Sequence, residues 1–401
     1  MSSFEHAQSA PGTVGNRTLA LTSELIACPS VTPDDAGCQD LVAQILQTAG
    51  FHVHRLSFGE GNARTENLWA THGGGAPVFA MVGHTDVVPP GPIEQWQSDP
   101  FVADVRGAKL YGRGAADMKA GVAASTLALT DYIAAHPDHP GTVALMLTSD
   151  EEGAAQFGVK ALMQWLGEQG IKIDMALIGE PSSNAQLGDQ IRIGRRGSMH
   201  VELRVMGVQG HVAYPEKARN PIHLGAPFLD KLAQHTFDTG NAHFPPTSMQ
   251  IYELSAGAGA NNVIPGELSV KLNFRFGTAS TPESLIMQIQ QCADALGLPV
   301  HMNSRIASLP FLTEKPRLRK AATAAIKAVL NLDTKPDTGG GTSDGRFIAP
   351  TGAEVIELGP VNDSIHKVNE HIEVADLERL RHVYLATIIR AMAGTQTSKE
   401  P

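Results

Sequence analysis

The sequence predicts an α/β protein built on a mixed, largely parallel sheet that helices cover, with a second domain inserted into it. Three apolar runs, at residues 78–82, 142–147 and 175–178, each stop abruptly at glycine, histidine or acidic residues, which is typical of buried strands. Helical patterns alternate with these runs, and this alternation favours parallel strands. Near residue 191 the pattern changes to half-exposed alternation, and the alternation of helix and strand resumes after residue 316.

The first part of the chain supplies most of the expected sheet. Apolar residues recur at helical spacing in four segments, 18–27, 39–48, 119–135 and 156–169. Strand patterns lie at 51–58, 67–71, 78–84, 142–148 and 175–178. The proline-rich loop at 89–100 is too long for a simple connector, so we expect it to shape the rim of a site.

A different order of elements follows. Strands are predicted at 198–206, 247–255, 267–276 and 300–305, and helices at 221–237 and 282–296. The resulting β-α-β-β-α-β order is that of a ferredoxin-like unit. We therefore predict a catalytic domain formed by residues 1–195 and 310–401, with an inserted domain at 196–309. The Gly- and Pro-containing junctions at 194–197 and 308–316 are the expected hinges.

The last part of the chain returns to the first pattern. It predicts a helix at 318–330, a glycine-rich loop at 338–344, a strand at 353–358 and a closing helix at 374–392.

Composition narrows the possible partners. The net charge of −10 argues against a nucleic-acid partner, and no apolar stretch approaches the roughly 20 residues that span a bilayer. The three cysteines lack CxxC spacing, which favours a reducing compartment. The N-terminal sequence MSSFEHAQSAPG does not have the pattern of a signal peptide. A cytoplasmic protein is the expectation.

Polar residues follow the buried strands where parallel strands would end together. His84 ends one strand pattern, the run 150–152 follows the next, and Glu180 follows the third, while Asp117 lies after a glycine-rich turn. In open α/β sheets this edge binds ligands, and imidazole with carboxylates suits a metal ion. A capped helix N-terminus explains Asp150 equally well, but not Glu180, which precedes a proline.

Several ordered motifs together resemble those of the M20 metallohydrolases. They are GHTDVVPPG, GRGAADMKAG, TSDEEG, IGEPS, GRRGSMHVELRVMGVQGHVAYP, NVIPGELSVKLNFRF, GGGTSDGRF and GPVNDSIHKVNEHI. The resemblance runs from about residue 20 to residue 392. It implies a zinc-peptidase-like catalytic domain and, within the family, an amide hydrolase that removes succinate from N-succinyl-L,L-2,6-diaminopimelate. That reaction belongs to lysine and diaminopimelate biosynthesis in a bacterial cytoplasm.

The resemblance implies two Zn²⁺ ions per subunit, with Co²⁺ as an alternative for one of them. Asp117 is then the carboxylate that bridges the ions. His84 and Glu180 complete the ligands of one ion, and Glu152 and His366 those of the other. A cis peptide bond after Asp117 is implied as well. With three protein ligands, each ion keeps open coordination positions for water and substrate, as a catalytic site requires.

Two further residues receive catalytic roles from the same resemblance. Glu151 is the general base that takes a proton from water, and Asp86 orients the imidazole of His84. Two alternatives for Glu151 stay open, a spare metal ligand and a simple cap. Asp86 has a turn-capping alternative.

The substrate implied by the resemblance has three carboxylates, which cations and amides would recognise. Arg195 or Arg196, with Ser198, would bind one carboxylate and Arg275 another. Asn262, Asn362 and the Gly341-Thr342 loop would add hydrogen bonds. His211, with Tyr214 and Asn261 nearby, would reach the partner subunit's site and stabilise the oxyanion. A homodimer that forms through the inserted domain, which also acts as a lid, is therefore expected.

Three other functions compete with this one. A related deacylase of the acetylornithine type would need no pocket for the succinyl carboxylate. An M20 dipeptidase or carboxypeptidase would hydrolyse plain dipeptides. A metal-free binding relative is the non-enzymatic alternative, although all five ligand positions and the base are present.

Overall fold

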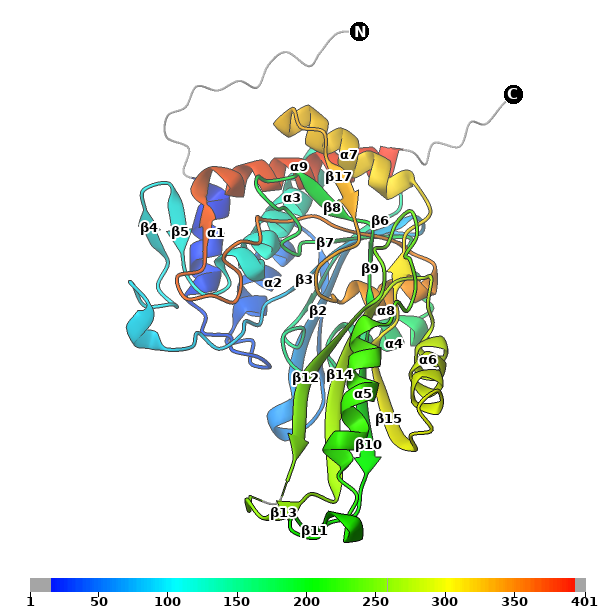
Figure 1. The fold of residues 1–401 in the computed structure, drawn as a ribbon. Helices are drawn as coiled ribbons and strands as arrows, with labels where there is room; N and C mark the ends of the chain where they lie inside the picture. Colours follow the sequence, from blue (N-terminus) through cyan, green and yellow to red (C-terminus); the bar gives the residue numbers. More distant parts are fainter. Residues whose placement is uncertain (1–15, 258, 394–401) are drawn as a thin grey trace, which may run out of the picture.

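The computed structural model describes residues 16–257 and 259–393, so the N-terminal sequence examined for a signal peptide lies outside the described residues. Within these ranges the main sheet has eight strands in the order β1-β2-β6-β3-β7-β18-β8-β17 (Figure 1). Its strands are β1 (His52–Phe58), β2 (Thr65–Gly73), β3 (Val78–His84), β6 (Thr142–Thr148), β7 (Met175–Ile178), β8 (Gln190–Arg192), β17 (Lys335–Asp337) and β18 (Glu354–Glu357). The four strands β6, β3, β7 and β18 pair in parallel, and β1 and β2 are antiparallel, which confirms the mixed, largely parallel sheet.

Helices cover both faces of this sheet because successive strand residues point in opposite directions. On β3, Phe79 and Met81 pack into the core beneath α1 (Arg17–Ile26), α2 (Cys38–Thr48), α3 (Ala120–Ala135), α7 (Arg317–Leu330) and α9 (Val374–Ala393). Ala80 and Val82 face the opposite core, which α4 (Val159–Glu168) and α8 (Gly345–Ile348) close. No helix among the described residues combines the length and the apolarity that crossing a membrane requires.

A second sheet has its own apolar core. Its four strands are β10 (Gly197–Met206), β12 (Ser248–Ala256), β14 (Glu267–Phe276) and β15 (Val300–Ser308). They pair antiparallel in the order β12-β14-β10-β15, and α5 (Pro221–Gln234) and α6 (Pro282–Asp294) pack on one face. Inward residues of β14 such as Phe274 alternate with half-exposed ones, as the sequence pattern predicted. The element order is the predicted β-α-β-β-α-β.

Two segments join the sheets and lie side by side. β9 (Gly194–Arg195) leads into the second sheet and pairs antiparallel with β16 (Phe311–Leu312), which leads out of it. The expected hinge segments 194–197 and 308–316 thus include a short two-stranded ladder. That they act as hinges stays a prediction.

Several short elements were not predicted. The strands β4 (Asp104–Arg106), β5 (Lys109–Tyr111) and β19 (His371–Glu373) form a small sheet beside the 3₁₀ turn Ile93–Gln95 in the proline-rich loop. At the far end of the second sheet, β11 (Gly210–His211) pairs with β13 (Val263–Ile264). Runs of two or three residues are too short to show a periodic pattern, so tertiary pairing alone defines them.

Candidate metal centre

Parallel register brings three predicted side chains to one edge of the main sheet. His84 at the end of β3 is level with Thr148 at the end of β6, so the run 150–152 emerges beside it. On the other side Val82 pairs with Ile178 of β7, which sets Glu180 level with His84. The strand ends therefore collect these groups, as the sequence predicted.

A tightly packed turn carries Asp117 to the same place. The peptide bond between Asp117 and Met118 is cis, as expected. The Met118 side chain lies against Gly83 and Gly179, where a Cβ atom would meet its methyl carbon at 2.9 and 2.7 Å. Glycine at both positions is required because the adjoining strands pass so close to this turn.

Asp117 lies between two histidines. Its Oδ1 is 3.3 Å from His84 Nε2, and its Oδ2 is 3.2 Å from His366 Nε2. His84 Nε2 is also 3.7 Å from Glu180 Oε1, and His366 Nε2 is 2.9 Å from Glu152 Oε1. The structure thus brings the five predicted ligands into two half-sites that share one carboxylate.

Unsatisfied buried atoms test whether these residues suit a cation. His84 Nε2 and Asp117 Oδ1 are buried without a hydrogen-bond partner, although each can donate an electron pair. Ligand atoms of His84, Asp117 and Glu152 lie within 4.8 Å of one another, and those of His84, Glu151 and Glu180 do as well. Imidazole nitrogen with carboxylate oxygen is a donor set that suits zinc and its neighbours in the transition series. The residues present therefore fit a pair of divalent cations.

The shifted pKa values of the clustered residues also favour a bound cation. Burial, followed by the nearby Glu180, raises the pKa of Glu151 well above its usual range. Burial and the nearby Asp117 raise the pKa of Glu180 as well. Hydrogen bonds to Asp117 and Glu152 raise the pKa of His366 to about 10. Buried carboxylates this close to one another need positive charge, which protons supply when no metal does.

Asp86 acts differently from its prediction. His84 Nδ1 lies 2.9 Å from the main-chain oxygen of Asp86 but 3.5 Å from its carboxylate. The carboxylate instead accepts hydrogen bonds from the backbone N–H groups of Glu151, at 3.3 Å, and Glu152, at 3.1 Å. The correction is that the main chain of Asp86 orients His84, while its side chain positions the two glutamates. The neighbouring Asp150 is a loop cap, since it accepts from the N–H groups of residues 155–157.

Arg195 is committed to an internal partner. Its Nε donates to both carboxylate oxygens of Glu357 at 2.8 Å, and its Nη2 also contacts that carboxylate. Nη1 donates to the carbonyl oxygens of Gly339 and Gly341. This arrangement disagrees with a direct role for Arg195 in substrate binding, because every guanidinium nitrogen is already used.

Unlike Arg195, Arg196 and Arg275 are not committed to an internal carboxylate. Neither has a carboxylate partner among the described residues, and Arg196 makes one long hydrogen bond, 3.4 Å, to Gly340 O. Burial and the positive charge of Arg196 lower the pKa of Arg275. Ser198 pairs with Arg275 across β10 and β14 but is itself buried. The two guanidinium groups thus repel each other and have no carboxylate beside them among the described residues.

The remaining predicted residues divide into two places. Thr342 and Asn362 are half-buried on loops of the main sheet, and Gly341 is exposed. His211, Tyr214, Asn261 and Asn262 lie at the β11–β13 end of the second sheet, far from β3 and β7 (Figure 1). One chain therefore does not bring this second group to the metal cluster.

Sequence reasoning missed two buried acids near the cluster. Glu370 receives hydrogen bonds from Arg113 and from the backbone of the turn that holds Asp117. Burial raises the pKa of Asp344 to about 7, despite the opposing charge of Arg346. Both residues stand in quoted motifs, GPVNDSIHKVNEHI and GGGTSDGRF, so their place there was the available signal.

Comparisons with known proteins relate the chain as a whole to one family. The model of peptidase family M20/M25/M40 matches residues 80–390. Succinyl-diaminopimelate desuccinylase of Methylococcus capsulatus is 54% identical over 92% of this chain and 96% of its own, and that of Thioalkalivibrio sulfidiphilus is 52% identical over 94% and 99%. The solved structure of Bacillus subtilis YXEP, a dinuclear metal-binding peptidase of the M20 family, has a TM-score of 0.70 at 15% identity and covers 94% of this chain and 98% of its own.

Proposed function

The chain belongs to peptidase family M20/M25/M40, and from this membership we propose that it hydrolyses N-succinyl-L,L-2,6-diaminopimelate to succinate and L,L-diaminopimelate. The observation that carries the proposal is the placement of Asp117, one oxygen toward His84 and the other toward His366. The substrate is that named for relatives more than 50% identical over nearly the whole chain. Lysine and diaminopimelate biosynthesis in a bacterial cytoplasm is the setting we propose.

We assign the ligands of two divalent cations to the five clustered residues. Asp117 would bridge them, with His84 and Glu180 on one side and Glu152 and His366 on the other. When bound, two such ions, Zn²⁺ in this proposal with Co²⁺ as an alternative for one, would supply Lewis acidity toward an amide carbonyl and a water molecule. Three protein ligands per ion leave room for water and substrate.

Glu151 is the proposed general base. Its ligand atom lies within 4.8 Å of those of His84 and Glu180, and Asp86 fixes its backbone. The carboxylate would take one proton from water as the new C–O bond forms. It would then deliver that proton to the amine nitrogen as the C–N bond breaks, which gives the amine and a carboxylic acid. The new carboxyl group would lose its own proton to the amine or to solvent, so succinate leaves as a carboxylate. Its raised pKa suits a group that must accept and release a proton.

Substrate carboxylates would bind at Arg196 and Arg275. These two cations lie near each other and carry no internal counter-ion among the described residues. A carboxylate placed between them would relieve their repulsion and could form paired hydrogen bonds. Thr342 and Asn362, which are half-buried on loops of the main sheet, would add hydrogen bonds from uncharged groups.

We further propose a homodimer through the segment 196–309. Strand β12 is an edge of the second sheet, and its Tyr252 and Leu254 are more than half exposed, which is unusual for an edge left unpaired. His211 accepts a hydrogen bond at Nδ1 from the N–H of Ala213 at 3.0 Å. The proton of its neutral ring is therefore on Nε2, which can donate to the oxyanion in the partner's site.

A substrate comparison with the zinc-loaded protein tests the reaction. We expect the highest kcat/KM for N-succinyl-L,L-2,6-diaminopimelate, with lower values for N-acetylornithine and for plain dipeptides. Higher kcat/KM on acetylornithine would assign the chain to that class of deacylase instead. Comparable rates on dipeptides would make it a peptidase, and a protein that neither holds zinc nor gains activity from it would be a binding relative.

A further inference from the structure

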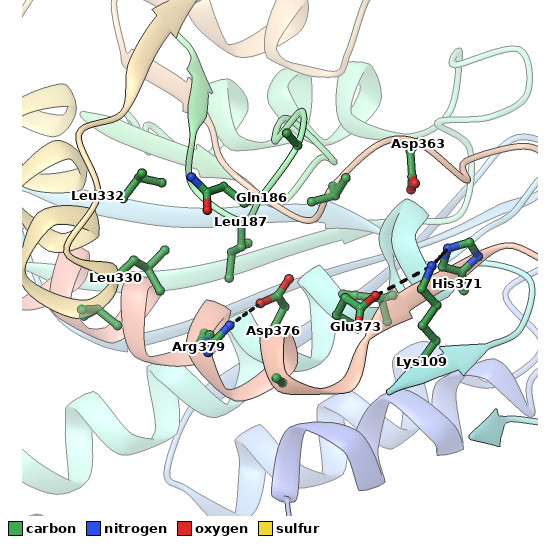
Figure 2. A pocket seen from close by; sticks show the side chains of 15 residues that line it. Lys109, Gln186, Leu187, Leu330, Leu332, Asp363, His371, Glu373, Asp376 and Arg379 are labelled. Carbon is green, nitrogen blue, oxygen red and sulfur yellow. Dashed lines mark hydrogen bonds and ion pairs between the residues drawn. The ribbon is translucent and has the colours of Figure 1, made fainter. Parts of the chain in front are cut away.

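A second cavity lies apart from the metal cluster. It has a volume of about 580 Å³, within the range of small-molecule sites, and lies between α9, β19, β5 and the segment 185–187 (Figure 2). Its lining includes no metal-cluster residue and neither Arg196 nor Arg275. Charged side chains of both signs and an apolar wall meet in it.

Two positively charged side chains that line the cavity have N–H donors without a partner among the described residues. The ring of His371 is oriented by Nδ1, which is 2.9 Å from Asn369 O, so its Nε2 accepts from Lys109 Nζ at 2.9 Å. Lys109 also lies 3.7 Å from Glu373, which leaves one of its three N–H donors without a partner within residues 16–257 and 259–393. Arg379 donates through Nη1 to Asp376 at 3.2 Å, and its Nε and Nη2 are unpartnered in the same ranges.

A carboxylate on the opposite side is also unpaired. Asp363 lines the cavity, and its side chain has no hydrogen bond or ion pair with any described residue. Figure 2 shows it across the cavity from Arg379 and Asp376. Leu187, Leu330 and Leu332 line the end of the cavity nearer to Arg379 and give it an apolar wall (Figure 2). The lining thus offers a cation for a carboxylate, an anion for an ammonium group and an apolar surface for a short chain.

We propose that this cavity binds a small aliphatic α-amino acid. Its carboxylate would accept hydrogen bonds from Lys109 and Arg379, its ammonium group would pair with Asp363, and its side chain would cover the leucines. Charge-assisted hydrogen bonds of both signs in one partly enclosed site favour a zwitterion over a molecule with a single charge. The cavity shares no lining residue with the proposed catalytic site, and this proposal does not rest on the substrate proposed above.

Isothermal titration of the full-length, metal-loaded protein tests the proposal with three matched probes. L-norleucine carries both charges, hexanoate lacks the ammonium group and pentylamine lacks the carboxylate. We expect norleucine to bind with one site per subunit, and the two singly charged analogues to bind at least about tenfold more weakly. Failure of norleucine to bind, or equal binding of either analogue, would overturn the proposal.

Variants of three lining residues test where norleucine binds. Lys109→Gln and Asp363→Asn should each weaken norleucine about tenfold, with Arg379→Gln as a second test of the carboxylate side. Because amino acids also chelate metals, Glu152→Ala is the matched control and should leave norleucine affinity unchanged. Loss of binding in Glu152→Ala, or retention in the three cavity variants, would place the ligand at the metal cluster and refute the second site. Circular dichroism of each variant checks that it is folded.

Discussion

Glu370 Oε1 accepts a hydrogen bond from the backbone N–H of Asp117 at 3.0 Å, across 253 positions of the sequence. The same oxygen accepts from the N–H of Ala116, and Oε2 accepts from the N–H of Gly114 and from Arg113. The buried carboxylate of Glu370 thus fixes the turn from which Asp117 directs one carboxylate oxygen toward each of two histidines. Glu370 lies four residues after His366, so one segment both contains one proposed metal ligand and positions another.

The first prediction concerns this anchor. Glu370→Gln places an amide N–H₂ against donors that face a carboxylate and leaves buried Arg113 without its counter-charge. We expect a loss of about 3–5 kcal/mol in the free energy of unfolding and lower metal content at equal total zinc. Denaturant unfolding and metal analysis measure both. Glu373→Gln, three residues away and half-exposed, is the control and should change stability by less than about 0.5 kcal/mol; equal losses in the two variants would contradict the anchoring role.

The second prediction separates base from ligand at Glu151. Glu151→Ala should lower kcat by about 10²–10⁴-fold, the usual contribution of a general base, while metal content stays near that of the unmodified protein. Glu152→Ala, one residue on, should instead lose metal, since Glu152 lies 2.9 Å from His366 Nε2. Metal loss in Glu151→Ala would reassign Glu151 as a ligand, one of the alternatives that the sequence left open.

The third prediction contrasts two neighbouring arginines. Arg195→Met breaks the buried pair with Glu357 and should cost about 3–5 kcal/mol of stability. Arg196→Met should leave the unfolding free energy nearly unchanged and raise KM for a succinylated substrate. Steady-state kinetics and denaturant unfolding of both variants provide the comparison. An Arg196 variant with unaltered KM would remove the carboxylate site proposed at Arg196 and Arg275.

The fourth prediction concerns pH. The pKa of His366 is raised from 6.5 to about 10 in the metal-free protein, chiefly by hydrogen bonds to Asp117 and Glu152. Its contribution to folding stability is therefore fully present below pH 6.5 and is lost as pH rises through about 10. Metal requires the neutral ring, so metal binding at a pH between these values should release a proton, and affinity should increase with pH.

Calorimetry in two buffers of different ionisation enthalpy measures that proton. His366→Gln is the control, because glutamine has no proton to release, and it should show a smaller buffer dependence. Metal affinity that is independent of pH between about 7 and 9 would be inconsistent with the raised pKa.

The fifth prediction tests the distal histidine. His211→Ala should lower kcat by about 10²–10³-fold, the effect of removing one oxyanion donor, with the sedimentation behaviour of the dimer preserved. Mixing His211→Ala with Glu151→Ala subunits sharpens the test. If His211 acts in the partner's site, heterodimers regain one working site, whereas no recovery on mixing would restrict His211 to its own chain.

Most of the fold was predictable because long elements repeat their pattern. The strand at 142–148 and the helix at 120–135 are uniformly apolar or regularly spaced, and their observed bounds differ little from those expected. The strands at 104–106, 109–111 and 371–373 could not be predicted, because three residues contain no period. The first two pair with each other locally, and the third pairs with 109–111 across more than 250 positions.

Local patterns were enough to predict that polar residues follow the buried strands, since each apolar run and its polar end lie within one short segment. The parallel pairing of β3 with β7 then sets His84 level with Glu180. Which arginine lacks an internal carboxylate partner depends instead on long-range contacts. Arg195 and Arg196 are adjacent and chemically identical, but residues of an extended chain point to opposite sides, and one side holds Glu357, 162 positions away. Likewise, the place of Glu370 beneath Asp117 depends on a long-range contact that no local pattern encodes.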